Sequence, residues 1–341
     1  DEAIEEQRKI LDHNPLDIDP YRALYRLYLH KHSYDEAWTL AAAISFMGKA
    51  DQEEMQFYED YRPQGMLQVK GRLSNDLWTR QLFHPDLNLY ISKIFEMIVP
   101  AALKAKVAMM ARQQSPIDPR FKQDPATSTV TFAKTFGWAG QVLGLSTPEL
   151  YVRSDMNDAI RAVPHLPPAS VAGKAVLSGF QPQELTFICG KHLASYRPEI
   201  YMRNLFPTQA ELTIMLFAGV MIAAPNTPMP PDGATQIRNT AQELAKYMDP
   251  VQMEHLRAVV KRFIEEGAKA NIKRWVQAAE LTQLRAGLLV CGDLSIARKI
   301  VTMEPSLPGD LSPEEKIKEL LLFSVSAEYA QLRSALGIAI G

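Results

Sequence analysis

Two similar tripeptides stand 34 residues apart near the start of the chain. Asp1-Glu2-Ala3 is matched by Asp35-Glu36-Ala37, and Pro15 follows Ala3 after twelve positions. A period of 34 residues is typical of stacked helix pairs, in which small residues let neighbouring helices approach and a proline follows the second helix. The spacing therefore restricts residues 1–61 to an array of paired helices.

This pattern resembles the tetratricopeptide repeat. Leu24 and Tyr28 stand where that repeat has a leucine and a large aromatic residue, and the resemblance makes them candidate contacts to a protein partner. The chain begins with the second helix of a unit, and such arrays need several stacked units for stability. We therefore expect residues 1–61 to be the end of a longer array, which either binds a partner or only braces the next domain.

Strand-like sequence is confined to about residues 149–178, and the remainder is punctuated as helices. The segment Leu150-Tyr151-Val152 and the segment 171–176 flank a proline-rich stretch whose prolines suit an edge or a loop. These patterns predict a mostly α (α+β) chain with one small β-sheet. We expect a linker over residues 62–84 and a second, largely helical domain over residues 85–341.

Composition narrows the class of partner. Hydrophobic residues make up 47% of the chain and the net charge is -2, so no strongly basic surface for nucleic acid is expected. The longest apolar run, residues 212–225, is too short to span a membrane, and we expect no stable insertion. The two cysteines, Cys189 and Cys291, suggest no disulfide framework and fit a reducing compartment, which favours the cytoplasm.

The segment 184–195 carries the strongest functional signal. In an H-E-x-x-H zinc helix, two histidines one turn apart bind the metal and the glutamate acts as general base. The five corresponding positions here run from Lys191 through His192 to Ser195. A lysine ammonium has no lone pair and repels a dication, so these positions predict no metal site and no cofactor.

Three stretches in order resemble the zinc metallopeptidase family that includes the CAAX prenyl endopeptidase and its bacterial heat-shock relatives. Residues 175–185 are similar to the start of the family's zinc helix. Residues 150–160, with Asn157 and Ala159, resemble the strand and Asn-Ala-Phe motif along the substrate cleft. Glu280 stands where the family has its third zinc ligand. The resemblance implies a peptidase scaffold that has lost its zinc motif.

The same residues also fit other interpretations. One stripe of an amphipathic helix contains Leu185, Ile188, Cys189, His192 and Leu193. This pattern is typical of a helix face buried in a structural core. Two catalytic alternatives are a Cys189–His192 nucleophile pair and a metal site built from His192, Glu280 and His165. A further hypothesis places an ion pair at the former metal position, with Arg197 and Glu199 facing Glu280 or Arg285.

Together these features predict a non-catalytic scaffold or adaptor of the bacterial cytoplasm. The repeat helices would bind a protein, and the edge around residues 156–163 would hold an extended peptide without cutting it. The alternative is a peptidase or amide hydrolase with an unorthodox metal or Cys/His site. A third interpretation makes the domain a structural cap on the helical array.

Overall fold

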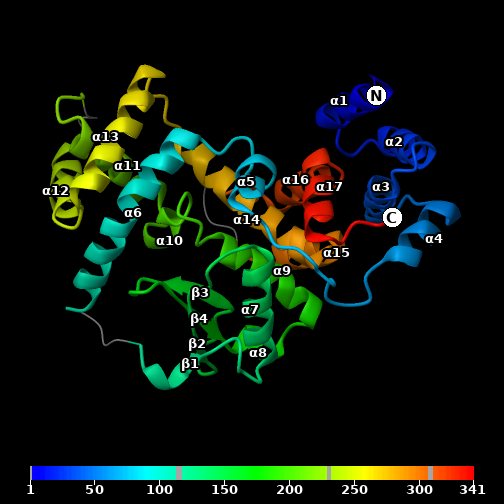
Figure 1. Ribbon diagram of the computed structural model, residues 1–341, viewed down its shortest axis with the longest axis horizontal. Helices are drawn as coiled ribbons and strands as arrows, with labels where there is room; N and C mark the ends of the chain where they lie inside the picture. The colour runs from blue at the N-terminus through cyan, green and yellow to red at the C-terminus, as the bar shows by residue number, and fades with distance from the viewer. Residues whose placement is uncertain (1, 113–116, 229–231, 306–309) are drawn as a thin grey trace.

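The computed structural model of this chain describes residues 2–112, 117–228, 232–305 and 310–341. The chain is mostly helical and has one small mixed sheet, which confirms the predicted fold class (Figure 1). Within the described ranges, no helix combines the length and the apolar content that crossing a bilayer requires.

Four helices form the N-terminal part of the molecule, and each packs against the next. They are α1 (Glu2–His13), α2 (Ile18–His30), α3 (Tyr34–Phe46) and α4 (Gln52–Tyr61). Ala37, Ala41 and Ile44 are fully buried on α3. The assignment of these helices to the tetratricopeptide repeat remains a prediction. Asp1 lies outside the described residues.

The predicted linker, residues 62–84, contains a short helix, α5 (Asn75–Leu77), followed by a π-helix, η1 (Trp78–Leu82). Trp78 and Leu82 are buried, and η1 packs against the C-terminal helix α17 (Ala327–Leu336). This segment is therefore tied into the fold by large apolar side chains.

The rest of the chain supplies two groups of helices around the sheet. One group consists of α6 (Leu89–Met110), α10 (Met202–Leu205), α11 (Gln209–Ala223), α12 (Ala234–Ala245) and α13 (Pro250–Glu265). The other consists of α7 (Thr131–Val142), α8 (Lys174–Ser178), α9 (Pro182–Ala194), α14 (Ile272–Cys291), α15 (Leu294–Met303) and α16 (Pro313–Ser324). Ser312 and Glu315 form a capping box at the start of α16.

The sheet has the strand order β1-β2-β4-β3, so β3 lies at one edge. Its strands are β1 (Lys122–Gln123), β2 (Glu149–Arg153), β3 (Ile160–Val163) and β4 (Ala169–Gly173). Strand β4 pairs in parallel with β2 and antiparallel with β3. The three longer strands lie within the predicted region. The two-residue β1 was not predicted, because it is too short to leave a pattern.

Helices α9 and α14 cross at the centre of the molecule. Gly190 makes the close approach possible, because a Cβ there would lie 2.4 Å from Val290 Cγ2 and 3.0 Å from Ala286 O. Gly287 on α14 lies against Phe187 on α9. The central helix pair thus fixes the position of Lys191 and His192 near the end of α9.

Candidate functional site

The N-terminus of α9 is built by local sequence. Pro182 occupies the first turn, and Gln181 and Glu184 form a capping box. Lys299 on α15 forms an ion pair with Glu184. These contacts fix the start of α9 and place His192 near its C-terminus, beside β4.

His192 belongs to a chain of polar contacts that ends on the sheet. Its Nε2 lies 2.8 Å from Ser170 Oγ, and Ser170 Oγ lies 2.8 Å from the Tyr196 hydroxyl. The Tyr196 hydroxyl donates to the backbone carbonyl of Ala169 at 2.7 Å. We call His192, Ser170, Tyr196 and the Ala169 carbonyl the polar chain.

The carbonyl at the end of the polar chain sets its direction. A carbonyl only accepts, so the single proton of Tyr196 is committed to Ala169. Ser170 then donates to Tyr196, and His192 Nε2–H donates to Ser170. A histidine that donates to a serine cannot accept its proton. The polar chain therefore holds Ser170 and His192 as structural groups and leaves the hydroxyl without a general base.

Burial and the neighbouring Lys191 ammonium lower the pKa of His192 to about 3. The imidazole is accordingly neutral at physiological pH. Cys189 is fully buried, and burial raises the pKa of its thiol. A buried thiol in its neutral form is a poor nucleophile. The Nε2 atom of His192 contacts Ser170 on β4 and not the Cys189 thiol.

The other degenerate positions have structural partners. Lys191 forms an ion pair with Glu304 after α15. The Ser195 hydroxyl donates to the His192 carbonyl at 2.6 Å and accepts from the Asn204 amide at 2.9 Å. Both side chains are thereby oriented within the protein.

Glu280 forms an ion pair at the heart of the helical core. Its Oε1 lies 2.7 Å from Lys316 Nζ on α16, and both side chains are at most 8% exposed. Arg203 Nη2 approaches Glu280 Oε2 at 3.9 Å. The predicted partner is wrong, because the cations at Glu280 are Lys316 and Arg203 and not Arg197.

Arg197 and Glu199 pair with each other. Arg197 Nε lies 3.1 Å from Glu199 Oε2, and Arg197 also donates to Asn75 Oδ1 at 2.8 Å. Arg285 pairs instead with Glu319 on α16, at 2.5 Å. The Arg197 guanidinium therefore ties the end of α9 to α5 and does not reach Glu280.

The described residues contain no group of three or more His, Cys, Asp or Glu side chains arranged to hold a metal ion. His165 lies by the sheet, where its Nδ1 is 2.7 Å from the Pro167 carbonyl and 3.8 Å from Glu149. Its contacts are thus distinct from those of His192 and Glu280.

The edge strand β3 presents backbone groups away from the sheet. Gly173 N–H donates to the Ala159 carbonyl at 2.9 Å. In the register that pairs Ile160 with Ala172, the hydrogen-bonded positions are then Ala159, Arg161 and Val163. The N–H and C=O groups of Ile160 and Ala162 consequently point outward. Asn157 and Ala159 are exposed in the turn before β3.

The two repeat residues predicted to bind a partner differ in accessibility. Leu24 is buried in the core at 1% exposure, so it packs within the protein. Tyr28 is partly exposed, and its hydroxyl accepts from Arg8 Nη2 at 2.9 Å. Of these two residues, only Tyr28 has solvent-exposed side-chain surface that a partner could contact.

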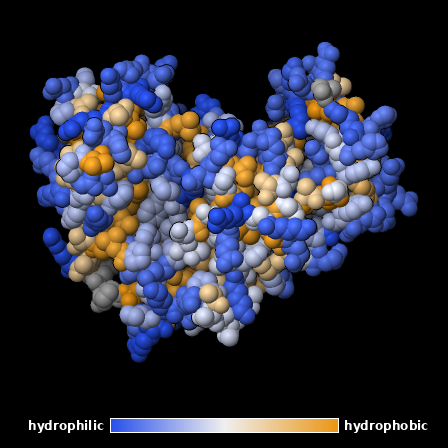
Figure 2. Space-filling model, viewed as in Figure 1, coloured by the Kyte–Doolittle hydropathy of each residue, from blue (hydrophilic) through white to orange (hydrophobic). Residues whose placement is uncertain are grey.

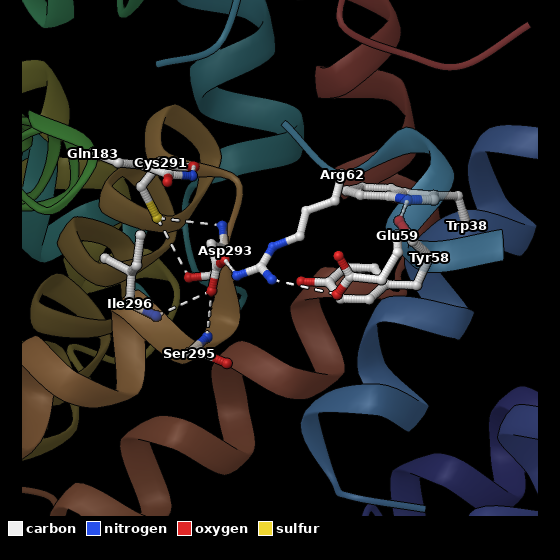
Figure 3. Close-up of polar contacts among 9 residues, drawn as sticks. All are labelled: Trp38, Tyr58, Glu59, Arg62, Gln183, Cys291, Asp293, Ser295 and Ile296. Atoms are coloured by element: carbon white, nitrogen blue, oxygen red, sulfur yellow. Dashed lines mark hydrogen bonds and ion pairs between the residues drawn. The ribbon is translucent and has the colours of Figure 1, made fainter. Parts of the chain in front are cut away.

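A small cavity of about 210 Å³ separates α3 and α4 from α14 and α15. At its rim Arg62 Nη2 donates to Asp293 Oδ2 at 3.0 Å, and the Arg62 guanidinium lies over the Tyr58 ring (Figure 3). Asp293 also caps α15 through the amides of Ser295 and Ile296. Sequence reasoning missed this cavity, because its walls come from segments more than 200 residues apart.

Sequence reasoning also missed Ser170 and Tyr196. Ser170 is a single polar residue in the buried strand β4, and no sequence signal relates it to a histidine 22 positions later. The buried polar residue within an otherwise small and apolar strand was the available clue.

No protein-family model, no curated protein and no solved structure matches the chain. The resemblance to tetratricopeptide repeats and to the metallopeptidase family therefore rests on the sequence motifs alone.

Proposed function

We propose that this protein is a non-catalytic binding scaffold that holds an extended peptide at the edge of its sheet. The observation that carries the proposal is the outward direction of the backbone groups of Ile160 and Ala162. A peptide in an extended conformation pairs with such an edge through main-chain hydrogen bonds.

The surroundings of the edge support this use. Strand β3 pairs only with β4 within the sheet, and its Arg161 side chain is exposed. Helix α10 contacts β3, but no backbone hydrogen bond between the described residues joins the two. An incoming strand would thus find donors and acceptors that no described backbone group occupies.

The proposed scaffold is non-catalytic because the polar chain leaves Ser170 without a general base. Ser170 donates its proton to Tyr196, and Lys191 and Ser195 replace the two zinc ligands of the family that the sequence resembles. The scaffold role extends to the helices of residues 1–61, where the partly exposed Tyr28 is the candidate contact. A cytoplasmic location is part of the same proposal.

The test uses a random peptide library displayed on phage and selected on the whole protein. Selected peptides are synthesised, and hydrogen exchange is measured at the Ile160 and Ala162 amides. We expect those two amides to be protected on binding. Ala162→Pro removes one outward N–H without breaking the β4 ladder, and it should weaken binding about tenfold. Ala162→Val retains the N–H and serves as the matched control.

Mass spectrometry of the same peptides after prolonged incubation distinguishes the alternative hydrolase. Intact peptides are expected, together with a zinc content near zero per chain after dialysis against trace zinc. Cleaved peptides, or one tightly bound zinc per chain, would contradict the scaffold. If peptide binding does not slow hydrogen exchange at the Ile160 and Ala162 amides, the sheet edge is not the binding site.

A further inference from the structure

A trough of about 480 Å³ lies between α6, α11 and α12, on the part of the molecule away from the repeat helices. Its walls are mostly apolar and include Ala105, Ala108, Met109, Phe206, Ile214 and Tyr247. None of the predicted site residues lines it. The trough is therefore separate from both the sheet edge and the polar chain.

The sequence of α6 opens this trough. Ala102, Ala105 and Ala108 face it from α6, and their short side chains leave space that larger residues would fill. Phe206, Ile214 and Tyr247 form opposing walls and are only partly buried. Figure 2 shows apolar surface where the C-terminal half of α6 lies in Figure 1. Apolar side chains that remain accessible in a concave site are typical of ligand pockets.

The two glutamates that line the trough have hydrogen-bond or ion-pair partners, whereas its two cations have no carboxylate partner among the described residues. Glu211 accepts from the Thr208 amide and hydroxyl in a capping box, and Glu243 pairs with Lys246. The Lys106 ammonium lies 4.8 Å from the centre of the Phe206 ring.

Within the described part of the chain, neither Lys106 nor Arg112 pairs with a carboxylate. The trough therefore presents two cations that have no ion-pair partner among the described residues, and Glu211 and Glu243 lie on the same lining.

We propose that this trough binds a small apolar carboxylate, in the manner of a fatty acid. The apolar chain would lie against the alanines of α6 and the aromatic rings opposite. The carboxylate would bind Lys106 and Arg112, since charge-assisted contacts to a carboxylate are strong and directional. A volume of about 480 Å³ lies within the usual range for sites that enclose a single organic ligand.

The test titrates dodecanoate into the whole protein by calorimetry, below the concentration at which dodecanoate forms micelles. We expect one molecule bound per chain. Replacement of both cations by Lys106→Met and Arg112→Met should weaken binding about tenfold or more. The exposed Lys104, also on α6, does not line the trough, so Lys104→Met is the matched control and should leave affinity unchanged.

Two further arms test the location and the head group. Ala105→Phe places a ring in the trough and should abolish binding, while circular dichroism checks that the helices remain. Dodecyltrimethylammonium has the same tail and the opposite charge, and it should bind at least about tenfold more weakly. Binding that survives Ala105→Phe, equal affinity for the two head groups, or no binding of dodecanoate would each overturn the proposal.

Discussion

At the scale of single residues, His192 shows how burial changes the chemistry of a side chain. Its pKa is lowered to about 3, against an ordinary value of 6.5, because burial and Lys191 disfavour the imidazolium. The unfolded chain takes up a proton near pH 6.5, whereas the folded chain stays neutral. The free energy of unfolding therefore decreases as the pH falls below 6.5 and continues to decrease down to about 3.

We predict that His192→Gln reduces this loss of stability in acid. The glutamine amide can still donate to Ser170, but it does not titrate. His84, whose pKa burial and Arg285 lower to about 4, acts in the same direction and should retain its part of the effect. Melting temperatures between pH 7.5 and pH 4 measure the difference. An unchanged slope would show that His192 does not take part, and the exposed His13→Gln is the control.

The sequence predicted the kind of contact that a residue makes better than it predicted the partner in that contact. The sequence indicated that Glu280 would sit in an ion pair. It did not indicate Lys316, which is 36 positions beyond Glu280 and reaches it only because α16 packs on α14. Periodicity predicts which face of a helix is buried, but a specific pair depends on how two helices cross.

At the scale of elements, the α9–α14 crossing depends on glycine. A Cβ at Gly190 would lie 2.4 Å from Val290 Cγ2 and 3.0 Å from the Ala286 carbonyl oxygen, so the two helices are closer than a side chain at that position would allow. Apolar periodicity predicted α9 itself, while the closeness of α14 had no signature beyond Gly190 and Gly287.

We predict that Gly190→Ala lowers the free energy of unfolding by about 1–3 kcal/mol, because overpacking outweighs the gain in helix propensity. Gly219→Ala on α11 is the comparison. Its new Cβ would meet the Ile94 Cγ2 methyl at 3.0 Å and Ile98 Cδ1 at 3.3 Å, which is less close than the contacts at Gly190 and involves no backbone atom. Urea denaturation of both variants measures the two changes. An equal effect at both positions would argue against a special role for the crossing.

At the scale of the whole molecule, the first and last parts of the chain are joined. Arg333 on α17 binds Asp35 on α3 through two contacts of 2.7 and 2.9 Å, and both side chains are at most 7% exposed. The Arg333 guanidinium also lies over the Trp38 ring, and the Ile340 amide donates to Asp35. The Asp35 of the repeated tripeptide thus anchors the repeat helices to the C-terminal helices.

We predict that Arg333→Leu lowers the free energy of unfolding by about 3–5 kcal/mol, since it leaves the Asp35 carboxylate buried without its cation. The double variant Asp35→Leu/Arg333→Leu should recover part of that loss. Arg120→Leu removes a solvent-exposed pair with Asp118 and should have a much smaller effect than Arg333→Leu. Chemical denaturation gives all three values. A small effect of Arg333→Leu alone would mean that the carboxylate finds another partner or solvent.

The joining of the two ends could not have been predicted from the sequence. Local patterns predicted the helices of residues 1–61 and the mostly helical remainder. The contacts between them depend on residues hundreds of positions apart, and neither Asp35 nor Arg333 differs locally from a charged residue on a solvated helix face. The cavity beside Arg62 and Asp293 and the trough beside α6 were unpredictable for the same reason.

The Asp35–Arg333 pair also has a consequence for synthesis of the chain on the ribosome. The two residues are 298 positions apart. Translation proceeds at roughly 5–20 residues per second, so Asp35 is synthesised about 15–60 s before Arg333. During that time α1 to α4 have one another to pack against, and Asp35 lacks its contact with Arg333. Their final docking therefore waits for synthesis of the C-terminal helices, and its timing is set by the appearance of Arg333.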